Sequence, residues 1–189
     1  MSISPDILNL YLLIQGIILM NILVLKHRKY LGGGYTIPML LSYTNGLPIF
    51  DMRPMGYSYA ETVTLLDSLG PMGIEYYITT QLALDWIYPA CFMLTYSIGI
   101  LWVYKKLATG ARIARIGALI AVLAGLFDYL ENIHLYKILS SYPKIDEDFI
   151  FSSNITTILK SGATTVAMSI FLLGLIRWCF VSLKAKKKG

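Results

Sequence analysis

The chain has 189 residues, of which 56% are hydrophobic and only 14% are charged, and its net charge is +5. Soluble domains carry about 25% charged residues, so the composition excludes an ordinary soluble domain and predicts an integral membrane protein. At this length we expect one all-α domain, residues 1–189, folded as a four-helix transmembrane bundle. The basic residues gather at the ends of apolar stretches, which indicates contact with membrane lipids and no nucleic-acid partner.

Four apolar stretches reach the roughly 20 residues that a helix needs to cross a bilayer. They cover about residues 7–25, 74–105, 113–138 and 155–183. The first has no Lys or Arg before it, unlike a signal peptide, and is expected to remain as a helix. Cys91 and Cys179 both lie within predicted spans, where we expect small buried side chains rather than a disulfide.

A long polar segment, about residues 30–72, separates the first two predicted spans and should form an extracytoplasmic cap. Within it, Ser58 and Glu61 show the spacing of a capping box. This pattern predicts a short amphipathic helix over about residues 59–69, ended by Gly70 and the proline that follows it. Its apolar face would hold Val63, Leu66 and Leu69. Such a helix could form a lid over a cavity or a packed cap without any gating role.

The distribution of basic residues predicts the topology. The loop after the second span and the C-terminal tail each carry four Lys or Arg residues, on the same side of a four-span protein. The positive-inside rule then places both chain ends in the cytoplasm of a multi-pass cell-membrane protein. The basic run at residues 26–29 favours the opposite orientation for the first span.

Polar side chains interrupt the third predicted span. Asp128, Glu131 and Asn132 follow a long hydrocarbon stretch, and a carboxylate facing lipid costs roughly 2.5–3.5 kcal/mol on insertion scales. Helical spacing places Asp128 and Asn132 on the same face as three small residues, which allow close helix packing. These small residues are Gly117, Ala121 and Gly125. We therefore expect the acids to face the interior of the bundle.

The neighbouring predicted spans also carry polar groups. Gln81, Asp85 and Tyr88 share one helical face of the second span, and Pro89 should kink the helix just beyond Asp85. Lys160 lies about one turn from the outer end of the fourth span, with Thr164 one turn further along.

This placement predicts a functional site in the extracytoplasmic half of the bundle. Its expected catalytic residues are Asp85, Asp128, Glu131 and Lys160. The residues expected to bind a substrate are Arg53, Gln81, Tyr88, Asn132 and Thr164. Crowded carboxyl groups at low dielectric cannot all ionise, so a protonated acid beside an ionised one would form a general acid–base pair. Lys160 or Arg53 would stabilise an anion, and the ligand would be a small lipophilic molecule such as a lipid, isoprenoid or quinone.

Other hypotheses remain open from the sequence. The polar residues could form a structural network that fixes helix register in a subunit of a larger membrane complex. Proton-coupled transport is another alternative, and so few spans would require a homo-oligomer. We expect no metal, because Lys160 and Arg53 favour simple ion pairing with the acids, and the chain shows no sequence motif of a cofactor site.

Four sequence strings together carry a resemblance that covers nearly the whole chain. They are FDMRPMGYSYAE (50–61), YYITTQLALDWIYP (76–89), LFDYLEN (126–132) and TTILKSG (156–162). In order and spacing they resemble a group of uncharacterised prokaryotic four-span membrane proteins with no assigned activity. The resemblance implies the four-span fold and a single recurring pattern of polar residues. This pattern comprises Arg53, Asp85, Asp128, Glu131, Asn132 and Lys160.

Overall fold

The computed structural model describes residues 36–186, which form helices, turns and loops without a strand. The elements in chain order are α2 (Thr36–Tyr43), η1 (Phe50–Met52), α3 (Tyr59–Tyr76), the π-helical η2 (Tyr77–Leu82), α4 (Ala83–Asp85), α5 (Tyr88–Lys106), α6 (Ala111–Ser141) and α7 (Glu147–Lys186). The predicted first span at residues 7–25 and the basic run at 26–29 lie outside the described residues.

Three helical segments of the described chain are long and apolar enough to cross a membrane. The first is Tyr59–Lys106, which runs from the start of α3 to the end of α5. The other two are Ala111–Ser141 and Glu147–Ala185. An all-α, multi-pass membrane protein is therefore supported, whereas the four-span bundle stays a prediction.

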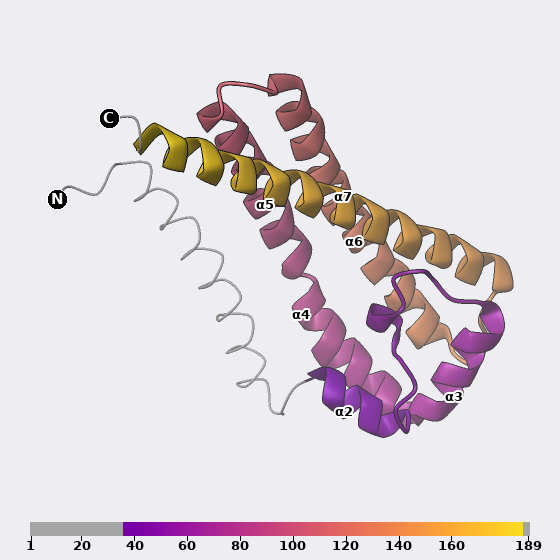
Figure 1. Ribbon diagram of the computed structural model, residues 1–189. Helices are drawn as coiled ribbons and strands as arrows, with labels where there is room; N and C mark the ends of the chain where they lie inside the picture. Colours follow the sequence, from indigo (N-terminus) through magenta and orange to yellow (C-terminus); the bar gives the residue numbers. More distant parts are fainter. Residues whose placement is uncertain (1–35, 187–189) are drawn as a thin grey trace.

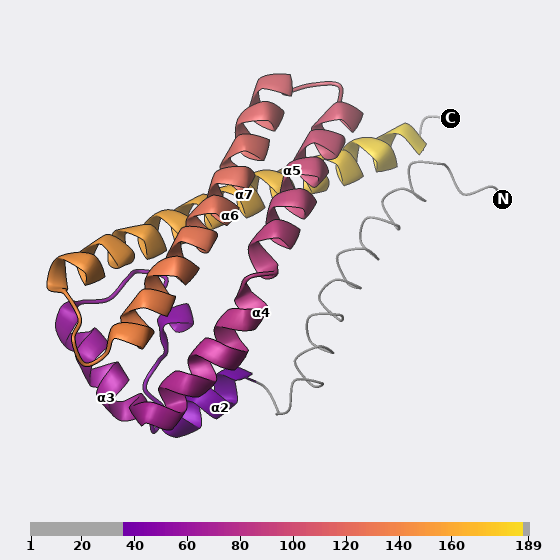
Figure 2. The same cartoon turned by 180° about the vertical axis from the view of Figure 1, so that it is seen from behind.

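The three long segments pack around one another, and the cap lies at one end of them (Figure 1). α5 and α6 run antiparallel and are joined by a short loop at the end away from the cap, while α7 crosses both obliquely. Seen from behind, α2 and α3 gather at the opposite end, beside the last turns of α6 (Figure 2). The cap therefore covers the end of the bundle where α6 finishes and α7 begins.

The buried face of α6 follows the phase predicted from its small and polar residues. Gly117, Ala121, Gly125, Asp128 and Asn132 are all buried, as is Glu131 beside them. Glycine at this face permits close packing, since a Cβ atom on Gly117 would lie 2.9 Å from Ile170 Cγ2 of α7. The prediction that both acids of this helix face inward is confirmed.

The predicted capping box is present at the start of α3. The Glu61 amide N–H donates to Ser58 Oγ at 3.2 Å, and the Ser58 amide N–H donates to Glu61 Oε2 at 2.8 Å. The helix is interrupted where expected, because Gly70 adopts φ 60° and ψ 179°, and a new helical stretch begins at Pro71. The apolar face differs by one position from the prediction: Leu65 is fully buried, whereas Val63 is only half-buried.

Helix α7 begins eight residues earlier than the predicted span at 155–183. The Asp146 carboxylate accepts a hydrogen bond from the Asp148 N–H at 2.8 Å, which satisfies a free donor in the first turn. Glu147 and Asp148 also lie in that turn, where negative charge interacts favourably with the helix dipole. Asp146, Glu147 and Asp148 therefore belong to the start of a helix.

Candidate functional site

A lysine and two carboxylates meet between α6 and α7. Lys160 Nζ lies 2.8 Å from Asp128 Oδ1 and 2.5 Å from Glu131 Oε2. We call Asp128, Glu131 and Lys160 the triad. The acids lie three residues apart on α6 and therefore share one face, and α7 crosses that face. Their side chains are only 9% and 4% exposed, against 25% for Lys160.

A chain of hydroxyl groups connects the triad to the cap. Thr157 Oγ1 donates a hydrogen bond to Glu131 Oε1. One turn earlier on α7, Ser153 Oγ lies 2.7 Å from the hydroxyl of Tyr57, which also interacts with the Thr157 side chain. All three hydroxyl-bearing residues are buried. The sequence analysis missed them, although Ser153, Thr157 and Lys160 follow the i, i+4, i+7 spacing of one helical face.

Asn132 compensates for the proline that breaks the second span. The helix turns irregular at residues 86–87, and α5 restarts with Pro89 in its first turn. Proline has no N–H, so the carbonyl of Asp85, four residues earlier, loses its helical partner. Asn132 Nδ2 donates to this carbonyl oxygen at 2.9 Å. This contact brings the main chain of Asp85 to the same level of the bundle as the polar face of α6.

Removing this amide should destabilise the protein. We expect Asn132→Leu to cost about 1–3 kcal/mol, because a buried carbonyl loses its donor. The cost should shrink when the same change is made in a Pro89→Ala background, where the main chain regains an N–H. Reversible unfolding of the four proteins in mixed detergent micelles measures this coupling, and equal costs in both backgrounds would contradict the assigned role.

The other predicted residues of the second span divide between the interior and the surface. Gln81 is buried, and its Nε2 donates to Asp85 Oδ2 at 2.8 Å. Tyr88 is 47% exposed and packs against Phe92, with ring centroids 6.3 Å apart. On α7, Thr164 is half-buried one turn beyond Lys160. The main chain of Asp85 is thus linked to α6, while its carboxylate contacts Gln81 of its own helix.

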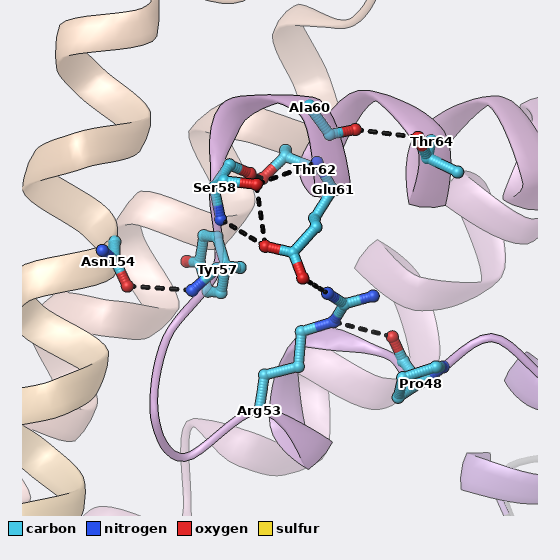
Figure 3. A network of polar contacts seen from close by, with 9 residues as sticks. All are labelled: Pro48, Arg53, Tyr57, Ser58, Ala60, Glu61, Thr62, Thr64 and Asn154. Atoms are coloured by element: carbon cyan, nitrogen blue, oxygen red, sulfur yellow. Dashed lines mark hydrogen bonds and ion pairs between the residues drawn. The ribbon is translucent and has the colours of Figure 1, made fainter.

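Arg53 lies in the cap, where its side chain contacts Glu61 and Pro48 (Figure 3). Its Nη1 forms an ion pair with Glu61 Oε1 at 3.3 Å, and its Nε donates to the Pro48 carbonyl oxygen at 2.9 Å. Arg53 was predicted to lie near the acids of the third span, but it neutralises Glu61, the carboxylate of the capping box. Sequence spacing could not show this, because the cap loop has no regular periodicity.

The cap loop is fixed directly to α7. The Tyr57 N–H donates to Asn154 Oδ1 at 2.9 Å (Figure 3). The preceding Gly56 has φ +91°, and a Cβ atom there would lie 1.8 Å from the same oxygen, so only glycine fits this close approach. On the other side, the Tyr77 hydroxyl donates to the carboxylate of Asp51. The loop therefore holds Tyr57 in place above the triad.

Burial raises the pKa of Tyr57 from 10.0 to about 12. The neutral phenol is thus favoured in the folded state, and this stabilisation is complete below pH 10 and lost as the pH rises toward 12. Two pKa units correspond to about 3 kcal/mol. In an ultraviolet titration, Tyr57→Phe should remove one late-ionising phenol from the 14 tyrosines.

One groove of the described chain lies away from the triad. It has a volume of about 630 Å³ and lies between α3, η2 and the last turn of α6, with Asp67, Glu75 and Tyr142 among its lining residues. A cavity beside Asp128 and Lys160 stays a prediction. Among residues 36–186, no group of three or more His, Cys, Asp or Glu side chains is arranged to hold a metal ion.

Comparison with known proteins adds no assignment to this site. No protein family, curated protein or solved structure matches the chain. The resemblance to four-span prokaryotic membrane proteins therefore stays an expectation. What the structure shows is a set of helices long and apolar enough to cross a membrane and a buried Asp–Glu–Lys ion cluster.

Proposed function

We propose that the triad is an acid–base site that binds a small lipophilic molecule and moves a proton within it. The observation that carries the proposal is the unequal exposure of the cluster. Its two carboxylates are almost fully buried, whereas Lys160 is 25% exposed. A ligand approaching between the helices would therefore meet the ammonium group first.

The hydrogen-bonding capacity of the triad supports this function. An ammonium group has three N–H donors, and two of those on Lys160 are used by Asp128 and Glu131. Lys160 has no further protein acceptor within residues 36–186. Its remaining donor would bind an acceptor oxygen of the ligand, such as a carbonyl, and would stabilise negative charge that develops there.

Asp128 is the candidate acid–base group. Within residues 36–186, Lys160 is its single hydrogen-bonding partner, so the carboxyl group keeps capacity for a ligand. In its ionised form, reached when its bound proton leaves to water, Asp128 would take a proton from the carbon beside the carbonyl, and the electrons of that C–H bond would move onto the oxygen held by Lys160. Returning the proton to another carbon completes an isomerisation without any co-reactant.

Two measurements test this function. Lipophilic ketones incubated with the purified protein in heavy water should gain deuterium beside the carbonyl, and Asp128→Asn should lower the rate at least tenfold. Mass spectrometry should detect an apolar compound that co-purifies with the wild type and is lost from Lys160→Met. Lys105→Met, at the far end of α5, is the control for both. An exchange rate equal to that of empty micelles, with no retained compound, would overturn the proposal.

A structural role is the second candidate. It is favoured by Glu131, whose two carboxylate oxygens accept hydrogen bonds from Thr157 and Lys160 of the same neighbouring helix. In this case the triad would join α6 to α7 and fix their register. Triad variants would then lose stability without any change in bound compounds. For either function we place the cap on the extracytoplasmic side and both chain ends in the cytoplasm, because the loop charges support this orientation.

A further inference from the structure

We infer that Thr157 is a positioning residue, which fixes Glu131 as the permanent anion of the triad and leaves Asp128 to carry the exchangeable proton. This inference rests on the proposed acid–base function and names the residue that divides the roles of its two acids. Three observations support it: the charge of the triad, the unequal number of donors to each carboxyl group, and the charges around Asp128.

The triad is not electrically balanced when every group is ionised. Two carboxylates and one ammonium group leave one net negative charge between α6 and α7, where both acids are less than 10% exposed. A net charge away from water is unfavourable unless it is paired. One bound proton makes the triad neutral, so one of the two carboxyl groups should be protonated.

Hydrogen bonds distinguish the two carboxyl groups. Glu131 accepts from two donors of α7, with Thr157 on Oε1 and Lys160 on Oε2. Among the described residues, Asp128 has Lys160 as its single donor, and it shares this donor with Glu131. Each donor to a carboxylate stabilises its ionised form, and hydrogen bonds to an ionised group are the stronger kind. The additional donor of Thr157 therefore keeps the charge on Glu131.

The charged groups around Asp128 act in the same direction. Lys160 from α7 attracts a negative charge there, whereas the carboxylates of Glu131 on α6 and Asp51 on η1 repel it. From α5, the phenol of Tyr88 also interacts electrostatically with Asp128. Among the described residues, one cation thus faces Asp128 against two neighbouring acids, which favours a protonated Asp128 in the resting protein.

Infrared spectroscopy can locate this proton without any ligand. A protonated carboxyl group absorbs at a higher frequency than a carboxylate, and a carbon-13 label shifts its band. At neutral pH we expect a carboxylic acid band that shifts when the protein contains carboxyl-labelled aspartate. Labelled glutamate should leave it unchanged. The band should be lost in Asp128→Asn, which assigns it among the aspartates.

The role of Thr157 is tested by two variants. Thr157→Val removes the donor, so part of the band should become sensitive to labelled glutamate, whereas Thr157→Ser keeps the hydroxyl and should retain the aspartate band. A purely structural threonine would not move a proton between two residue types. A glutamate-sensitive band in the wild type, an unchanged band in Thr157→Val, or no acid band at all would overturn the inference. Because no ligand is added, these outcomes are separate from failure of the ketone exchange that tests the proposed function.

Discussion

Replacing Lys160 with methionine is expected to destabilise the protein by about 3 kcal/mol. Breaking a buried ion pair from one side costs about 3–5 kcal/mol, since it leaves a charge without its partner. The lower end of that range applies because Lys160 is a quarter exposed. Methionine keeps much of the side-chain volume, so the loss reports mainly on charge. Reversible unfolding in mixed detergent micelles provides the measurement.

Two comparisons separate this effect from general disruption. Adding Glu131→Gln to Lys160→Met removes the carboxylate that would be left without its cation, so it should restore part of the lost stability. Lys105→Met changes an exposed lysine near the α5–α6 loop and should have little effect. If Lys160→Met were as stable as Lys105→Met, the triad would not hold α6 and α7 together.

The second large effect is expected at Gly125, where α6 lies against the restart of α5. A Cβ atom on Gly125 would lie 2.2 Å from Met93 Cγ and 2.9 Å from the Pro89 carbonyl oxygen. Met93 is flexible and can move, but the Pro89 main chain can move only if the first turn of α5 shifts. We expect Gly125→Ala to destabilise the protein by about 1–3 kcal/mol, the usual range for overpacking.

Gly162 on α7 provides the matched control. A Cβ atom there meets no atom within 4 Å, and alanine favours a helix over glycine by about 1 kcal/mol. Gly162→Ala should therefore be neutral or stabilising in the same unfolding measurement. Similar destabilisation by both changes would show that close contact at Gly125 is not the cause.

The sequence predicted the features that depend on regular spacing. The buried face of α6 was found from small residues four apart, and the start of α3 was found from Ser58 and Glu61, because helices impose their period on the sequence. The same reasoning explains why Asp128 and Glu131 were recognised as inward-facing. It also predicted the break at Pro89, where a carbonyl loses its partner.

The sequence could not predict contacts made by irregular segments. Tyr57 reaches Ser153 from a loop 96 residues away along the chain, and no period relates the two positions. Arg53 was expected near the acids because it is basic and belongs to the pattern that the resemblance implies, whereas the loop turns it toward Glu61. Thr157 could have been found from its helical face with Lys160, but threonine on a membrane helix is common and carries little information alone.

The hydroxyl chain from Tyr57 to Glu131 has a thermodynamic consequence. The phenol meets Ser153 and Thr157, and Thr157 in turn donates to the buried carboxylate. Any rearrangement that lifts the loop from α7 would alter the hydrogen bonding of Thr157 and hence the affinity of the neighbouring acids for a proton. Linkage is reciprocal, so protonation of those acids must equally change how firmly the loop is seated. Docking of the cap loop and ionisation of a buried carboxyl group would then form one coupled equilibrium.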